Sequence, residues 1–216
     1  THFHERKWAS DHGWVPREFT VTEASTAALI ERGIPFTFTT IDPGNAHLQA
    51  IIGYDARRGT LSVRDPYFRN SGEALADKLL SHYRAHGPRG MALVPTHEAH
   101  RFDGVELPDA ALWDKLHALD AALDAHRRPA AEEIVASMEA AAADHRLALE
   151  ARRRLAIYDG NPTAQLAAVD RLLAQFPDNQ SLQYEWLALQ RGQANRGERL
   201  ATLQRLIAKK DTHPIF

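Results

Sequence analysis

The sequence holds one pair of residues with the potential to act as a catalytic base and its orienting group, His47 and Asp65. They lie at the two ends of residues 45–66, NAHLQAIIGYDARRGTLSVRDP, a segment typical of a β-hairpin. If their side chains meet, the aspartate accepts a hydrogen bond from one imidazole nitrogen and leaves the other free as a base. A thiol or hydroxyl nucleophile needs such a base. Polar residues at hairpin ends are more often without a catalytic role, so spacing alone is a weak signal.

The register of the hairpin decides whether the two side chains meet. A three-residue turn at 55–57, with Tyr54 opposite Arg58, places His47 directly opposite Asp65 on one face of the sheet. Directly opposed residues have Cβ atoms about 5 Å apart. A bulge at Gly59 would shift the register by one residue and separate the pair.

No nucleophile for this base is evident in the sequence. The 216 residues contain no cysteine, which excludes disulfides, thiolate metal sites and a thiol nucleophile within this chain. Ser25, Ser62 and Ser71 are available, but none lies in a Gly-x-Ser-x-Gly elbow. Ser62 is also expected on the face opposite Asp65. We therefore do not expect a serine triad.

The elements that hold the pair belong to an α+β pattern. In chain order we expect a helix over 22–32, strands over 36–41, 47–54 and 60–65, a helix over 71–86 and a strand over 90–94. Thr22 is suited to cap the first helix, and Gly33 followed by Pro35 ends it. This order predicts a largely antiparallel sheet accompanied by helices.

Several short pieces of this region resemble, in order and spacing, the double-glycine-leader (bacteriocin-processing) peptidases of the papain-like cysteine peptidase superfamily. The matching pieces are Leu29-Ile-Glu-Arg-Gly-Ile-Pro35, His47, Ile51-Ile-Gly-Tyr-Asp55, Gly59-Thr-Leu and Val63-Arg-Asp-Pro66. The resemblance covers about residues 20–95. It implies that His47 is a general base, that Asp65 orients it, and that residues 1–100 are the C-terminal half of a papain-like α+β domain.

The family also has a catalytic cysteine at the start of a helix and a glutamine that assists the oxyanion hole, and neither has a match here. Because the sequence begins with Thr1 rather than methionine, we expect the front half of the domain to lie outside it, with residues 1–19 as the tail of that half. The alternative is a natural relic that keeps the sheet without the chemistry. Half a sheet exposes apolar surface, so self-association is expected.

From about residue 105 the composition shifts to alanine, leucine and charged residues. Nine residues beginning at Leu166 and nine beginning at Leu200 align with five identities and an offset of 34 residues. This is the tetratricopeptide period, in which two antiparallel helices form each repeat. First helices are expected over 147–158 and 182–190, preceded by an atypical helical pair over 113–125 and 132–142. Residues 105–216 are thus predicted to form a tetratricopeptide-like array.

Three other groups of residues have simpler explanations. His82 and His86 are four apart in a predicted helix, with His97 and His100 following, but without HExxH or a third ligand they favour exposed histidines over a metal site. Arg152-Arg153-Arg154 is expected to lie on a solvated helix face rather than in an anion or nucleic-acid patch. Trp113, Tyr184 and Trp186 are expected to fill the space between stacked helices. No cofactor motif is present.

The function that these observations indicate is a cysteine-peptidase-like protein whose helical array binds a peptide or protein segment, with the nucleophile outside this chain. The alternative is a non-enzymatic interaction scaffold with a degenerate peptidase-like domain. A formal charge of -2 argues against a dedicated nucleic-acid or membrane-surface protein. No apolar run approaches the roughly 20 residues of a membrane span, and no signal peptide is evident. A cytoplasmic, bacterial-type protein is the default expectation.

Overall fold

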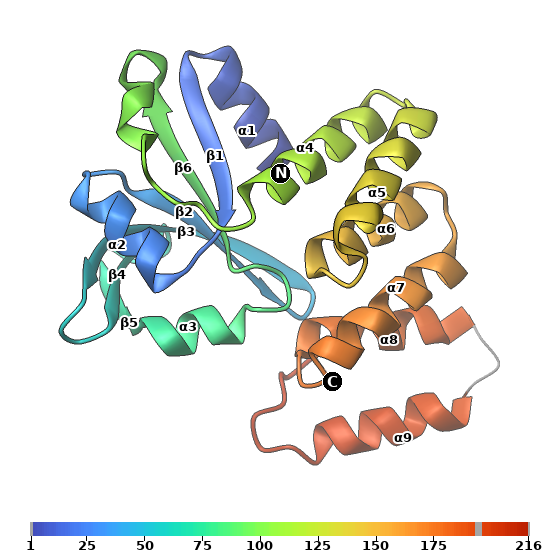
Figure 1. Ribbon diagram of the computed structural model, residues 1–216. Coiled ribbons are helices and arrows are strands. Elements are labelled where there is room, and N and C mark those ends of the chain that lie inside the picture. Colours follow the sequence, from blue (N-terminus) through green and yellow to red (C-terminus); the bar gives the residue numbers. More distant parts are fainter. Residues whose placement is uncertain (1, 193–195, 216) are drawn as a thin grey trace. The chain divides into compact units, whose positions relative to one another are not determined.

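The computed structural model describes residues 2–192 and 196–215, which pack as two compact units (Figure 1). The first unit runs to Ala121, except for residues 41–46, which are grouped with the second unit. The second unit contains the rest of the chain from Ala122. This division by packing falls later than the change in composition near residue 105.

One six-stranded sheet is the frame of the first unit (Figure 1). Its strands along the chain are β1 (Trp14–Thr20), β2 (Phe36–Asp42), β3 (Asn45–Asp55), β4 (Thr60–Arg64), β5 (Gly72–Leu75) and β6 (Arg89–Pro95). Their order in the sheet is β1-β6-β2-β3-β4-β5, and β6 pairs antiparallel with both β1 and β2. β4 likewise pairs antiparallel with β3 and β5. With the helical region that follows, this sheet confirms the predicted α+β class.

The apolar face of the sheet is covered by α2 (Glu23–Glu31) and α3 (Ala76–His82). α2 begins as predicted: the Thr22 hydroxyl accepts the Ser25 N–H at 3.1 Å and the Ser25 hydroxyl accepts the Thr22 N–H at 3.0 Å. It ends at Gly33, whose φ of +66° favours glycine. The core between helices and sheet includes Phe19, Leu29, Phe38, Ile51 and Leu61, which are fully buried.

The opposite face carries a buried charged cluster beneath α1 (His2–Asp11) and α4 (Ala110–Asp124). Glu18 alternates along β1 with the core residue Phe19, so its carboxylate points to this second face, where the residue is only 1% exposed. There Arg89 Nε donates to Glu18 Oε2 at 2.7 Å, and Arg6 Nη1 lies 3.5 Å from Glu18 Oε1. A buried carboxylate is tolerated here because two guanidinium groups compensate its charge.

Trp113 belongs to this cluster, which corrects its predicted place between stacked helices. The Arg89 guanidinium lies 4.9 Å from the centre of the indole ring, and the indole N–H donates to Thr20 Oγ1 at 3.2 Å. The burial of Trp113 therefore fixes the start of α4 to the sheet. Trp186, by contrast, lies in the core of the helical unit, as predicted.

Residues 71–86 were expected to form one helix, but the structure divides them. Gly72–Leu75 is the edge strand β5, and the helix α3 begins only at Ala76. Pairing with β4 outweighs the helical leucine spacing of this segment, because it satisfies backbone groups that the sheet edge would otherwise expose. The sequence pattern also gave no element to residues 1–19, most of which form α1 and β1.

Substitution of Gly90 by alanine is expected to destabilise the sheet unit by about 1–3 kcal/mol through overpacking. A Cβ at this position would lie 2.7 Å from Val21 Cγ2 and 2.9 Å from Phe19 Cζ, inside the core. Urea unfolding monitored by circular dichroism measures the loss. Gly72→Ala is the matched control, since a Cβ at Gly72 meets no atom within 4 Å. Equal stability of the two variants would contradict the expected packing conflict.

The helical unit is built from helices whose starting points recur along the chain. They are α5 (Arg128–Ala142), α6 (Arg146–Tyr158), α7 (Pro162–Gln175), α8 (Gln180–Leu189) and α9 (Arg196–Ile207). The starts of α5, α7 and α9 are 34 residues apart, as are those of α6 and α8. Asn161 and Asn179 begin α7 and α8, because each side chain accepts a backbone N–H of the first turn. Together with α4, these helices account for each helix predicted after residue 105.

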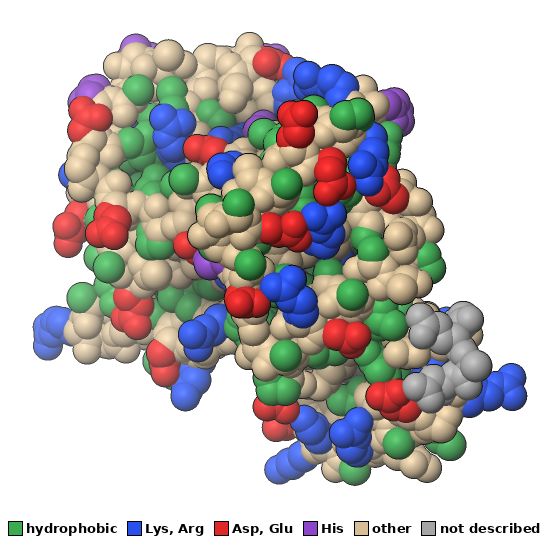
Figure 2. All heavy atoms as spheres, turned by 45° about the vertical axis from the view of Figure 1, so that its right-hand side comes forward, with side chains coloured by type: hydrophobic (Ala, Val, Ile, Leu, Met, Phe, Trp, Pro, Cys, Tyr) green, Lys and Arg blue, Asp and Glu red, His purple; other side chains and the backbone are tan. Residues whose placement is uncertain are grey.

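The three arginines of α6 engage carboxylates instead of lying on a solvated face, which corrects the expectation for them. Arg152 reaches Glu139 on α5 and Arg153 reaches Glu185 on α8, while Arg153 and Arg154 share Glu150 on α6 itself. Figure 2 accordingly shows basic and acidic side chains interspersed on the face in view. The closest contacts are Arg152 to Glu139 at 2.6 Å, Arg153 to Glu150 at 2.7 Å, Arg153 to Glu185 at 2.9 Å, and Arg154 to Glu150 at 2.8 Å.

Candidate active site

His47 and Asp65 meet at one end of the β3–β4 hairpin. His47 Nε2 lies 2.7 Å from Asp65 Oδ2, a hydrogen-bond distance. The other ring nitrogen, Nδ1, is hydrogen bonded to no residue in the part of the chain that the structure describes. The side chains are 21% and 10% exposed, so the pair is largely shielded but reachable from solvent.

The register that joins them differs from the predicted one. Asp55 pairs with Thr60, which makes the turn four residues long rather than three. The register then shifts between Ile51 and Gly53, so that Ile52 is a bulge within β3. The bulge thus lies within β3 and not at Gly59, the alternative position suggested by the sequence.

This bulge is the reason that the two residues share a face. Beyond it Ala50 pairs with Arg64, and continuing the same register places Gln49, not His47, opposite Asp65. His47 is two residues along from Gln49 and so projects from the same face. Without the extra residue at Ile52 the register would slip by one, and His47 and Asp65 would project from opposite faces.

Gln49 is a third member of the site that sequence reasoning missed. Its Nε2 donates to Asp65 Oδ2 at 2.6 Å, the same oxygen that contacts His47. The Tyr67 N–H donates to the other oxygen, Asp65 Oδ1, at 2.8 Å. The available signal was position: Gln49 lies two residues from His47 on a strand and therefore on the same face. The carboxylate of Asp65 is thus held on both oxygens.

These contacts hold Asp65 in its anionic form. The hydrogen bond from Gln49 is the largest influence and lowers the pKa of Asp65, and the Tyr67 N–H and His47 lower this pKa further. Burial acts in the opposite direction, but the net pKa of Asp65 lies below its ordinary value. An anionic Asp65 favours the tautomer of His47 that carries its proton on Nε2, which leaves a lone pair on Nδ1.

Tyr67 also fixes the plane of the imidazole. Its ring stacks on that of His47 with centroids 4.9 Å apart and an angle of 22° between the planes. The ring of Tyr67 is otherwise open to solvent, with the residue 83% exposed. The imidazole is therefore held in plane by a stacked ring and along its edge by a carboxylate. This arrangement suits a base that accepts a proton from one direction.

Ser25 and Ser62 do not complete this arrangement, whereas Ser71 lines a cavity together with Gln49 and Asp65. Ser25 is used by the cap of α2. Ser62 pairs with Gly53 and projects from the face opposite Asp65, as expected from the alternation of side chains. His82 and His86 do not lie in one helix as predicted, because α3 ends at His82. Within residues 2–192 and 196–215 no three histidine or acidic side chains are close enough to hold a metal ion.

Comparison with known families places this site in a recognised domain. The model of the Peptidase_C39 like family matches residues 6–90, a segment that contains His47, Gln49 and Asp65. Residues 6–90 are a Peptidase_C39-like domain. Searches of curated proteins and of solved structures find no match to the chain. The Peptidase_C39-like domain agrees with the predicted peptidase likeness, whereas the likeness to tetratricopeptide repeats stays a prediction.

Acid should weaken the Peptidase_C39-like domain through Asp65. The pKa of Asp65 is lower in the folded protein than in the unfolded chain, where it is about 3.9. The ionised carboxylate therefore stabilises the fold at pH values above the unfolded-state pKa. This stabilisation is lost as the pH falls through the lower folded-state pKa. Asp65→Asn cannot titrate, so the stability difference between the parent and this variant should shrink between about pH 5 and pH 2. Urea midpoints across that range measure the difference.

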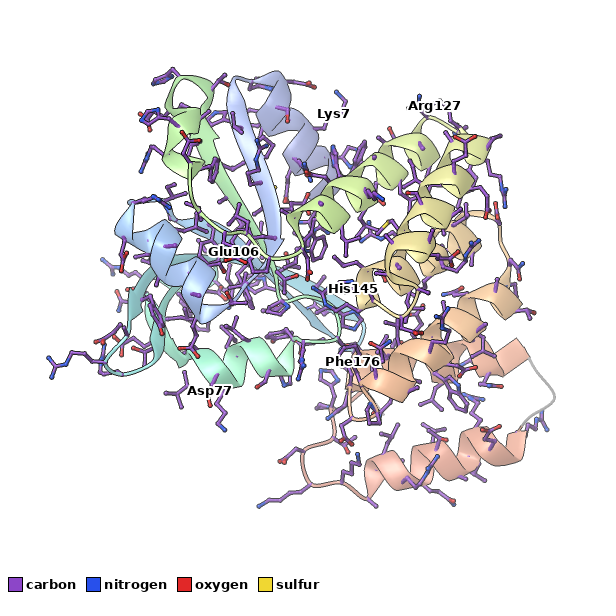
Figure 3. The ribbon with its side chains drawn as sticks, viewed as in Figure 1. Lys7, Asp77, Glu106, Arg127, His145 and Phe176 are labelled. Atoms are coloured by element: carbon purple, nitrogen blue, oxygen red, sulfur yellow. The ribbon has the colours of Figure 1, made fainter. Side chains whose placement is uncertain are left out.

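The control for this titration is Asp77→Asn. Asp77 lies in the first turn of α3 and points away from the sheet (Figure 3). The Asp77→Asn variant should follow the parent protein across the same pH range. If Asp65→Asn and Asp77→Asn show the same dependence on pH, the hydrogen bonds to Asp65 do not act as described.

Proposed function

We propose that the Peptidase_C39-like domain supplies the general base and its orienting carboxylate to a cysteine-peptidase site. The observation that carries this proposal is the 2.7 Å contact between His47 Nε2 and Asp65 Oδ2, with Nδ1 left without a hydrogen bond among the residues described. Gln49 and Tyr67 support it by holding the carboxylate and the imidazole plane. Since the sequence contains no cysteine, the thiol comes from outside these 216 residues, either on the same polypeptide or on a partner.

The reaction follows from this geometry. The thiol transfers its proton to His47 Nδ1, and the thiolate attacks the carbonyl carbon of a peptide bond. The imidazolium then gives the proton to the departing amine, which leaves an acyl thioester. Water, deprotonated by the same nitrogen, attacks the thioester and releases the acid and the thiol. Asp65 stays ionised throughout and stabilises the imidazolium.

We infer that α5 to α9 form a tetratricopeptide-like array that binds a peptide or protein segment. The recurrence of helix starts at 34 residues supports this inference. The contact between Arg153 on α6 and Glu185 on α8 supports it as well, since it joins helices one period apart. Stacked helical hairpins of this kind expose a concave surface that accommodates extended or helical segments.

The test of the peptidase proposal begins with the protein isolated from its natural source. Its intact mass and that of any partner isolated with it are measured after treatment with iodoacetamide near neutral pH and again at low pH. We expect one cysteine that is modified rapidly at neutral pH and much more slowly in acid, as a thiolate would be. A preparation without any reactive thiol would overturn the proposal.

A non-enzymatic scaffold is the second candidate, and the absence of cysteine from the sequence favours it. It predicts that the isolated protein binds its partner without hydrolysing peptides. It also predicts that His47→Ala leaves partner binding unchanged. Loss of partner binding in a folded His47→Ala variant would contradict the scaffold candidate.

A further inference from the structure

A cavity of about 480 Å³ lies beside the His47–Asp65 pair, within the sheet unit. We call it the side cavity. Gln49 and Asp65 line one wall, so its contents lie next to the groups that orient His47. Val63, Ala74 and Leu79 give most of the remaining wall an apolar surface. Its volume is within the range of pockets that enclose small ligands or large side chains.

An exposed aromatic loop forms the rim of the side cavity. Phe68 lines the cavity while the residue remains 68% exposed, and its neighbour Tyr67 is 83% exposed. Burial of an aromatic side chain is favourable, and two neighbouring aromatic side chains that remain exposed do not gain this free energy. Exposed apolar patches of this kind mark interaction sites. The loop that holds them is itself ordered by Arg64, whose Nη1 donates to the carbonyl of Arg69 at 2.6 Å.

One cation at the rim has no acidic partner among the residues described. Arg69 lines the side cavity and forms no ion pair with the residues described in this structure. Two acidic side chains line the cavity as well: Glu73 is paired with Arg58 at 2.7 Å, and Asp65 accepts hydrogen bonds from Gln49 and from the Tyr67 N–H. An apolar hollow next to a cation without an acidic partner is complementary to a ligand that joins an apolar group to a carboxylate.

We propose that the side cavity binds a peptide segment in which a large apolar side chain stands next to an acidic one. The apolar side chain enters between Val63, Ala74 and Leu79, and the acidic side chain contacts Arg69. Binding itself requires only the contacts just described. That the bound segment belongs to the substrate rests on the function proposed above, and it would make the cavity a determinant of specificity next to the catalytic pair.

Gly72 offers a way to close the cavity without disturbing the fold. It lines the cavity, pairs with Val63, and shares a face of β5 with Ala74. A Cβ at Gly72 meets no atom within 4 Å, so a leucine side chain has space there and extends into the hollow. Gly197→Leu in α9 is the matched control, since a Cβ at that glycine is equally unobstructed.

The experiment is a titration of the 216-residue chain with the blocked peptide Gly-Ser-Phe-Glu-Ser-Gly, observed through the methyl NMR signals of Val63 and Leu79. We expect saturable shifts of these signals. Replacing Phe by Ala or Glu by Lys in the peptide should weaken binding about tenfold or more, equivalent to at least about 1.4 kcal/mol. Gly72→Leu should abolish the shifts, whereas Gly197→Leu should preserve them.

Charge reversal tests the acidic contact separately. Arg69→Glu should bind the Glu peptide about tenfold more weakly and bind the Lys peptide better than the parent does. Arg57→Glu, in the β3–β4 turn, adds the same charge away from the cavity and should not reverse the preference. Methyl signals that stay unchanged up to millimolar peptide, or binding that survives Gly72→Leu, would overturn the proposal.

The result of the binding experiment does not depend on whether the proposed peptidase is active. Binding is measured without hydrolysis, so a chain that binds the peptide through the cavity supports the inference even if no reactive thiol exists. Conversely, if the thiol-containing protein hydrolyses peptides equally well with and without Gly72→Leu, the cavity has no part in specificity. The peptidase proposal would then stand alone.

Discussion

His47→Ala should lower kcat/KM for peptide hydrolysis by the thiol-containing protein about 10³-fold or more, with the fold nearly unchanged. General-base catalysis by a positioned side chain contributes about 10²–10⁴-fold, and the thiol also depends on this imidazole for its ionisation. The fold should persist because Asp65 keeps its hydrogen bonds from Gln49 and from the Tyr67 N–H. Steady-state kinetics on a peptide substrate, together with circular dichroism, measure both effects.

His97→Ala is the control for this substitution. The His97 side chain is 81% exposed and lies in the 3₁₀ segment after β6, away from the hairpin. It should leave turnover at the parent value. A folded His47→Ala protein with undiminished turnover would rule out His47 as the base, whatever the source of the thiol.

Glu150→Ala should destabilise the helical unit by about 3–5 kcal/mol, the range found when one partner of a buried ion pair is removed. Burial by itself would raise the pKa of Glu150, but the charges and hydrogen bonds of Arg153 and Arg154 outweigh it and hold this pKa far below its ordinary range. The side chains of Glu150 and Arg153 are each only 18% exposed. Without Glu150, the part-buried guanidinium of Arg153 keeps its ion pair with Glu185 but loses the one with Glu150.

Urea unfolding monitored through the fluorescence of Trp186 reports on this unit, provided that the other tryptophans are replaced by phenylalanine in both proteins. Asp178→Ala is the control, because the pair of Asp178 with Lys209 has side chains 86% and 51% exposed and should contribute little. If Glu150→Ala unfolds at the same urea concentration as Asp178→Ala, the cluster around α6 is not a stabilising ion network.

The sequence predicted those elements whose signals are local. Thr22 and Gly33 mark the ends of α2 because capping and a positive φ depend on neighbouring residues. The 34-residue offset likewise predicted where the later helices begin. β5 was missed because its conformation is decided by pairing with β4, which local helical spacing does not report.

The sequence predicted the residues His47 and Asp65 of the candidate site but not the strand register that brings them together. Residue types and alternation indicated that His47 and Asp65 share a face, and the structure brings them together. Next to the turn the pairing is displaced by three residues from the predicted register, and the bulge at Ile52 moves it back by one. The net displacement of two residues preserves the face. A bulge leaves no strong mark in composition, and the place of Gln49 opposite Asp65 follows only from it.

The position of β6 has a consequence for the order in which the chain can fold. β6 lies between β1 and β2 in the sheet. Trp14 in β1 pairs with Pro95 in β6, so these partners are far apart in the sequence. β3, β4 and β5 pair through short connections and so have a small loop-closure cost. During synthesis, the strands that carry His47 and Asp65 can therefore pair while β1 and β2 still lack their common neighbour. The hairpin can thus form before the neighbouring part of the sheet is complete.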